Sequence, residues 1–172
     1  MNRKLSEYLD KNKVEIDVEL DEMWSFVGSK GRKVWIWLAY HRKSRQILAW
    51  TVGDRSSETL DKLLELLKVF KIRRHYTDNF MSYGEKISKE NRMIGKIYTQ
   101  GIERMNLTLR NFVRRLNRKT ICYSRRLDMH VTAIYLVIRK LFYFKDEKEM
   151  NDLFLFPNIN QIANGSLFDC LS

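Results

Sequence analysis

The fold is decided by a short alternating stretch near the start of the chain, which reads Ile16-Asp17-Val18-Glu19-Leu20-Asp21. Its apolar residues recur at every second position, which is the period of a β-strand, so its three acids share one face. Residues 34–40 are a nearly continuous apolar and aromatic run, and residues 46–52 have the same character after a basic turn. The short connections predict an antiparallel meander of three strands.

After residue 55 the apolar residues follow a helical period. Ser56 or Ser57 can cap a helix over residues 57–70. Its apolar face is made by Leu60, Leu63, Leu64 and Leu67. A short strand follows at residues 72–77 and ends at Asp78. The intervening helix would let this strand lie parallel to an earlier one.

The next segments predict a short helix over 81–89, a strand over 92–98 and two longer helices. The first long helix has its apolar residues at steps of three and four, namely Ile102, Met105, Leu109, Phe112 and Leu116. The second has Leu127, Val131, Ile134, Ile138 and Leu141. The order of all these elements predicts the α/β class, a mixed sheet with flanking helices.

The length and net charge of the chain limit the classes of function that it can have. The chain has 172 residues, a net charge of +11 and a pI of about 9.7, which favours partners that carry phosphate. No apolar run reaches the roughly 18 residues of a membrane span, so no membrane partner is expected. The start of the chain has no signal peptide, so we expect a cytoplasmic protein, or a nuclear one in a eukaryotic host. Cys122 and Cys170 form neither a zinc spacing nor a disulfide framework.

Three carboxylates stand in distinctive local sequences. Asp21 is expected near the end of the first strand, Asp78 just past the end of the fourth, and Glu103 in the first turn of a helix. If the two strands are parallel neighbours, their carboxyl ends meet where sites of such sheets usually lie. Converging carboxylates can hold divalent metals for phosphodiester chemistry. Each acid alone is more often solvated, a turn residue or a capping residue, and Asp17, Glu19 and Glu22 could each serve instead of Asp21.

A basic segment follows Glu103. It contains no acid between Arg104 and Arg126, and its cations are Arg104, Arg110, Arg114, Arg115, Arg118, Lys119, Arg125 and Arg126. A solvated helix face usually mixes both signs, so this run favours contact with nucleic-acid phosphates. Glu103, Asn106, Arg110 and Arg114 would form one polar stripe, opposite the apolar face of the helix.

Four segments together resemble a known family. They are Val18 to Gly28, Tyr76 to Tyr83, Tyr98 to Arg110, and Arg115 to Ser124. In this order they resemble the catalytic blocks of the transposases of the "insertion sequence one" family, over about residues 14–144. The second block departs from the usual pattern, because Asn79-Phe80 stands where relatives commonly have Gly-Trp.

The resemblance implies a ribonuclease H-like fold and a DDE active site made by Asp21, Asp78 and Glu103. These residues would be both the catalytic residues and the ligands of two Mg²⁺ or Mn²⁺ ions. Arg110 matches the basic residue seven places after the glutamate. The substrate would be double-stranded DNA, at transposon ends and target, and transposases commonly act as multimers, so a homo-oligomer is compatible with the resemblance.

The expected organisation is a polar leader at residues 1–13, a catalytic domain at 14–145 and a tail of unclear structure at 146–172. Members of the family join an upstream DNA-binding region to this catalytic part. Two rival functions stay open. One is a non-catalytic, DNA-binding or regulatory product of a mobile element, which would need no metal. The other is a nuclease or resolvase of the same fold.

Overall fold

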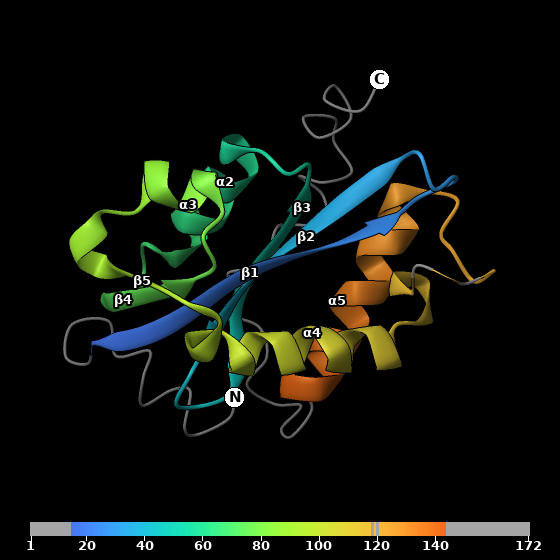
Figure 1. Ribbon diagram of the computed structural model, residues 1–172. Helices are drawn as coiled ribbons and strands as arrows, with labels where there is room; N and C mark the ends of the chain where they lie inside the picture. Colours follow the sequence, from blue (N-terminus) through green and yellow to red (C-terminus); the bar gives the residue numbers. More distant parts are fainter. Residues whose placement is uncertain (1–14, 118, 120, 144–172) are drawn as a thin grey trace.

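A mixed five-stranded sheet forms the centre of the part of the chain that the computed structural model describes, residues 15–117, 119 and 121–143. Its strands are β1 (Ile16–Phe26), β2 (Lys33–His41), β3 (Gln46–Gly53), β4 (Ile72–Thr77) and β5 (Arg92–Ile94). They lie in the order β3-β2-β1-β4-β5 (Figure 1). The predicted meander is confirmed, because β1 pairs with β2 and β2 with β3 in antiparallel fashion.

The fourth strand lies parallel to the first, as the crossover predicted. Glu19 of β1 pairs with Tyr76 of β4, and β4 in turn pairs with β5 in parallel. The α/β class is therefore confirmed, and the strand order and directions are consistent with a ribonuclease H-like fold.

Helices cover both faces of the sheet. They are α2 (Ser57–Leu67), α3 (Met81–Lys86), α4 (Gln100–Phe112) and α5 (Leu127–Tyr143), with 3₁₀ turns η1 (Lys89–Asn91), η2 (Lys96–Tyr98) and η3 (Arg114–Leu116). The expected cap of α2 is present, since the Ser56 hydroxyl accepts a hydrogen bond from the Thr59 backbone N–H. Figure 1 shows α2 and α3 on one side of the sheet, and α4 and α5 on the other.

Two apolar cores separate these layers. On one face Leu20 and Trp37 pack with Leu60 and Leu63 of α2. On the other face Met23, Ile36 and Trp50 pack with residues of α4 and α5, namely Ile102, Leu109, Val131, Ile134 and Ile138. Because side chains alternate along β1, Leu20 and Glu22 face α2 and α3, whereas Asp21 and Met23 face α4.

The helices predicted over 57–70 and 81–89 end earlier, at Leu67 and Lys86, and three further elements differ from the prediction. The strand predicted over 92–98 ends at Ile94 and continues as η2. Helix α4 ends at Phe112, whose side chain is exposed, and Leu116 belongs to η3. The periodic pattern continued past this end because Leu116 itself is buried. Strand β1 runs on to Phe26, so Asp21 lies mid-strand rather than near the strand's end.

The predicted leader and tail lie outside the described residues. Within the part of the chain that is described, no helix is long and apolar enough to cross a membrane.

Candidate active site

Asp21 and Asp78 come from neighbouring parallel strands. Glu19 is paired with Tyr76, so extending that register by two residues brings Asp78 beside Asp21. Asp78 directly follows β4, and its Oδ1 accepts a hydrogen bond from the Phe80 backbone N–H at 2.9 Å. This short-range bond is typical of an aspartate in a turn, and it fixes the carboxylate at the end of the strand.

Glu103 reaches the same region from α4. It lies in the first turn of the helix and is exposed, and its Oε1 accepts a hydrogen bond from the Thr99 hydroxyl at 3.1 Å. An acid at this position also interacts favourably with the helix dipole. Three separate elements therefore direct the three predicted carboxylates toward one region.

The pKa of Asp21 reflects the nearby acidic side chains. Burial and, to a smaller extent, the charges of Glu22, Asp78 and Glu103 together raise the pKa of Asp21 to about 7. Carboxylates that repel one another in a partly buried site favour either protonation or a bound cation. Asp21 is thus the most perturbed of the predicted site residues.

Asn106 joins the site from the next turn of α4. Its Nδ2 donates a hydrogen bond to Asp21 Oδ2 at 2.6 Å, and the side chain is only 8% exposed. The prediction that Asn106 lies on a polar stripe facing away from the core is therefore wrong. This side of α4 lies over the acidic face of β1, where polar residues can be buried as partners of other polar residues.

The donor set suits a hard divalent cation, since it contains carboxylate oxygens and a buried amide oxygen. In the conformation described, no three His, Cys, Asp or Glu side chains among the described residues are arranged so as to hold a metal ion. One oxygen of each predicted carboxylate is already engaged, by Asn106, by the Phe80 N–H or by the Thr99 hydroxyl.

Glu19 was considered only as a substitute for Asp21, and the structure gives it a different place. It is buried, and its Oε2 accepts a hydrogen bond from the Ile102 backbone N–H at the start of α4. Arg42 pairs with its Oε1 at 3.3 Å and also stacks on the Tyr76 ring. Burial raises the pKa of Glu19, which these partners partly offset.

Glu22 occupies the opposite face of β1. Its Oε1 accepts two hydrogen bonds from the Arg55 guanidinium, and its Oε2 accepts one from the Tyr83 hydroxyl at 2.9 Å. Burial raises the pKa of Glu22, with a contribution from the Asp78 charge. Sequence reasoning missed Arg55 and Tyr83. The only available signal was the Asp21-Glu22 pair itself, because adjacent strand residues point to opposite faces.

The predicted DNA-binding cations divide into two groups. Arg104, Arg114, Lys119, Arg125 and Arg126 are exposed, and Arg126 is paired with Asp128. Arg110 and Arg115 are partly buried. Arg115 donates a hydrogen bond to the Ser124 hydroxyl. Arg118 lies outside the described residues.

Arg110 makes contacts inside the protein. Its guanidinium donates hydrogen bonds to the Leu116 carbonyl at 2.7 Å and to the Trp24 carbonyl at 3.2 Å. It thereby joins α4 to η3 and to the strand residue three places after Asp21. Its predicted contact with DNA stays a prediction.

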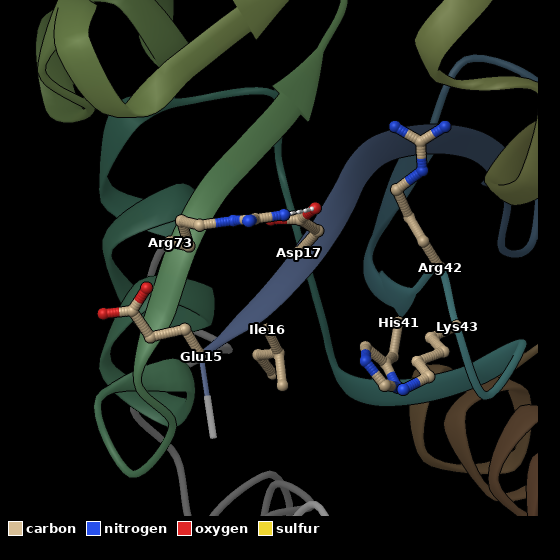
Figure 2. A pocket seen from close by; sticks show the side chains of 7 residues that line it. All are labelled: Glu15, Ile16, Asp17, His41, Arg42, Lys43 and Arg73. Atoms are coloured by element: carbon tan, nitrogen blue, oxygen red, sulfur yellow. Dashed lines mark hydrogen bonds and ion pairs between the residues drawn. The ribbon is translucent and has the colours of Figure 1, made fainter. Parts of the chain in front are cut away.

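A separate pocket of about 380 Å³ lies at the start of β1 and is lined by Glu15, Ile16, Asp17, His41, Arg42, Lys43 and Arg73 (Figure 2). Figure 2 shows Arg73 of β4 reaching across to Asp17, with which it forms two hydrogen bonds. Asp17 precedes Asp21 by four residues, which is about 13 Å along a strand. The pocket is therefore distinct from the carboxylate site.

Comparison with known proteins agrees with the resemblance read from the residues. The model of the family described as "IS1 transposase" matches residues 14–144. The chain is 48% identical over 126 residues to the insertion element iso-IS1n protein InsB of Shigella dysenteriae, covering 73% of this chain and 96% of that protein. It is 39% identical over 123 residues to the insertion element IS1 protein InsB of Shigella flexneri, and the match covers 70% of this chain and 94% of that protein.

A third relative, the insertion element IS1 4 protein InsB of Escherichia coli K12, is 37% identical over 128 residues, covering 73% of this chain and 77% of that protein. The family match spans both strands and the helix that carry the three carboxylates. The chain belongs to the IS1 transposase family.

Proposed function

We propose that this chain cuts and joins DNA at transposon ends, with Asp21, Asp78 and Glu103 holding two Mg²⁺ or Mn²⁺ ions. The observation that carries the proposal is the convergence of acidic side chains from β1, the end of β4 and the first turn of α4, where Asn106 donates a hydrogen bond to Asp21. Burial and the neighbouring acidic charges raise the pKa of Asp21, and a bound cation would relieve this repulsion. Membership of the transposase family supports DNA as the substrate.

The bound ions would supply a polarised phosphodiester and an activated water or 3′-hydroxyl for in-line attack. The protein's own residues do the positioning. Asp78 is fixed by the turn after β4, and Asp21 is oriented by Asn106. Glu103 is exposed, so its side chain can leave the Thr99 hydroxyl and turn toward the two aspartates at small cost.

Exposed cations would hold the substrate. Arg104 lies on α4 directly after Glu103, and Arg114, Lys119 and Arg125 follow α4 in sequence. Contacts to phosphate carry no sequence information, so these residues give affinity rather than recognition of particular ends. The protein would act wherever the DNA lies, which in a bacterial host is the cytoplasm.

Joining two ends in one event requires two catalytic sites, so a homo-oligomer on DNA is part of the proposal. Light scattering after size-exclusion chromatography of the DNA complex would measure it. A monomer on paired ends would contradict this part alone.

The proposal is tested by nicking and strand transfer of labelled DNA with Mg²⁺ or Mn²⁺. Asp21→Asn, Asp78→Asn and Glu103→Gln should each lower the rate by about a hundredfold or more, since even residues that only support metal ligands cost 10–100-fold. Asp61→Asn, an exposed acid on α2, is the matched control and should retain activity. DNA affinity should survive in all four variants.

Two results would contradict the proposal. Cleavage that persists in the three site variants would remove the carboxylates from the chemistry. DNA binding without any metal-dependent cleavage by the unmodified chain would favour the non-catalytic alternative.

A further inference from the structure

The amide of Asn106 is satisfied on one side only. Its Nδ2 donates to Asp21 Oδ2, but its Oδ1 is buried and has no hydrogen-bond partner among the described residues. Asn106 is only 8% exposed, so bulk water does not readily supply the missing hydrogen bond to Oδ1. A buried carbonyl oxygen without a partner loses its hydration and gains no hydrogen bond in return. The site therefore holds a polar oxygen for which the described residues provide no donor.

The position of this oxygen identifies what it lacks. Asn106 lies one helical turn after Glu103, on the side of α4 that faces Asp21. The charged side chains that raise the pKa of Asp21 are all acids, namely Glu22, Asp78 and Glu103. A neutral amide oxygen beside several carboxylates is a common ligand set for hard divalent cations.

We propose that Asn106 is a further member of the cation site, whose NH₂ group orients Asp21 and whose carbonyl oxygen serves the cation as a neutral ligand. This inference rests on the proposed function. The oxygen and nitrogen of an asparagine amide exchange places by rotation about one bond. In the orientation described, the NH₂ group donates to Asp21 and Oδ1 is left for the cation, whereas the rotated amide would set Oδ1 against Asp21 Oδ2 and lose the bond that orients this carboxylate.

A purely structural role predicts something different. If Asn106 only held α4 against β1, losing its amide would lower stability with and without metal by the same amount. If it also serves the cation, the loss appears in metal affinity itself. The two roles therefore separate in a measurement of binding rather than of activity.

The experiment titrates the full chain with Mn²⁺, following free Mn²⁺ by its electron paramagnetic resonance signal, and records thermal unfolding with and without the metal. Asn106→Leu keeps the approximate shape and removes the amide. It should weaken Mn²⁺ binding by about tenfold or more. Asn111→Leu, an exposed asparagine on the same helix, is the matched control and should bind as the unmodified chain does.

Asn106→Asp supplies a second test that does not depend on the leucine variant folding. It restores an oxygen ligand but places a further negative charge beside Asp21. The metal-free variant should melt at a lower temperature, and the gain in melting temperature on adding Mn²⁺ should exceed that of the unmodified chain. An unchanged gain would mean that position 106 is out of reach of the cation and would overturn the inference, whereas Asn106→Leu makes the distinction from a purely structural role.

The outcomes are distinguishable. Weaker Mn²⁺ binding in Asn106→Leu together with the larger gain in Asn106→Asp supports the inference. Unchanged Mn²⁺ affinity in Asn106→Leu, while Asp21→Asn abolishes binding, overturns this inference and leaves the proposed function standing. No Mn²⁺ binding by the unmodified chain, alone or with DNA, overturns both.

Discussion

Glu19 and Ile102 are joined by a buried hydrogen bond, in which the Ile102 backbone N–H donates to Glu19 Oε2 at 2.7 Å. The bond connects the strand that carries Asp21 to the first turn of the helix that carries Glu103. A carboxylate at the start of a helix satisfies an N–H group that has no partner within the helix and interacts favourably with the dipole. Glu19 thus fixes the spacing between two of the three predicted catalytic residues.

Gly101 makes this close approach possible. A Cβ at position 101 would lie 2.7 Å from Tyr40 Cε1 and 2.9 Å from both carboxylate oxygens of Glu19. We therefore expect Gly101→Ala to lower the free energy of unfolding by about 1–3 kcal/mol, which is the usual cost of overpacking. It should also reduce nicking more than DNA binding, because Glu103 would be displaced. Urea denaturation and the two DNA assays measure these effects.

Gly31→Ala is the control for this substitution, because a Cβ there would meet only Ser29 Oγ at 3.8 Å. Its unfolding free energy should stay within about 0.5 kcal/mol of the original. Equal effects of the two substitutions would show that the contact with Glu19 is not what requires glycine at position 101.

The Tyr83 hydroxyl is expected to stabilise the second buried acid. Tyr83→Phe removes the hydrogen bond to Glu22 Oε2 and leaves that oxygen without this donor. The free energy of unfolding should fall by about 1–3 kcal/mol, the cost of a buried polar group that loses its partner. Tyr123→Phe, at an exposed ring that packs on Phe26, should change it little. Urea denaturation of both variants measures the difference.

A double-substitution cycle checks the assignment. If the hydroxyl acts through Glu22, Tyr83→Phe should cost much less in a Glu22→Gln background than alone. Additive costs would mean that Tyr83 stabilises α3 by packing and has no specific effect on Glu22.

The order of strands and helices could be predicted because hydrophobic periodicity reflects burial directly. Apart from the ends of some elements, the error concerns a polar residue. Asn106 follows a helical pattern that assigns polar residues to solvent, yet α4 lies over the acidic face of β1 and buries this side chain against Asp21. A single-sequence pattern records which residues are apolar, and it carries no information on which polar faces meet.

The carboxylates show the same limit. The family resemblance selected Asp21 over its neighbours, and this choice stays a prediction. The structure shows that the two neighbouring acids have other partners. Glu19 is engaged by the start of α4, and Glu22 by Arg55 and Tyr83 on the other face. Alternation along the strand predicted which face each acid takes, but the partners come from distant segments and could not be predicted from local sequence.

Arg110 is expected to contribute more to stability than to DNA affinity. Arg110→Ala removes donors from the Trp24 and Leu116 carbonyls and should lower the free energy of unfolding by about 2–3 kcal/mol. Arg114→Ala, at an exposed residue of η3, should leave stability within about 0.5 kcal/mol and weaken DNA binding. Urea denaturation and DNA affinity at several salt concentrations separate the two effects.

The salt dependence decides whether Arg110 also contacts phosphate. Removing a residue that contacts phosphate reduces the slope of log affinity against log salt concentration by about one. If Arg110→Ala produced that change in slope and left unfolding unaltered, the internal role assigned to this guanidinium would be wrong.

His130 should make the fold sensitive to mild acid. Its side chain is fully buried on α5, with Nδ1 at 3.0 Å from the Ser124 hydroxyl, and Arg115 donates to the same hydroxyl. Burial and, to a smaller extent, the nearby Arg115 charge together lower the pKa of His130 to about 4. The unfolded chain therefore binds a proton at a higher pH than the folded one, so stability falls as pH drops from about 6.5 toward 4.

Between about pH 7.5 and about pH 5, this group alone should remove about 2 kcal/mol of stability. Asp21, Glu19 and Glu22 have raised pKa values and act in the opposite direction, so the contribution of His130 is isolated by comparison with His130→Gln. Between these two pH values, the unfolding free energy of His130→Gln should fall by about 2 kcal/mol less than that of the unmodified chain. Urea denaturation at the two pH values measures it, and an identical pH dependence in both proteins would show that His130 is protonated in the folded state.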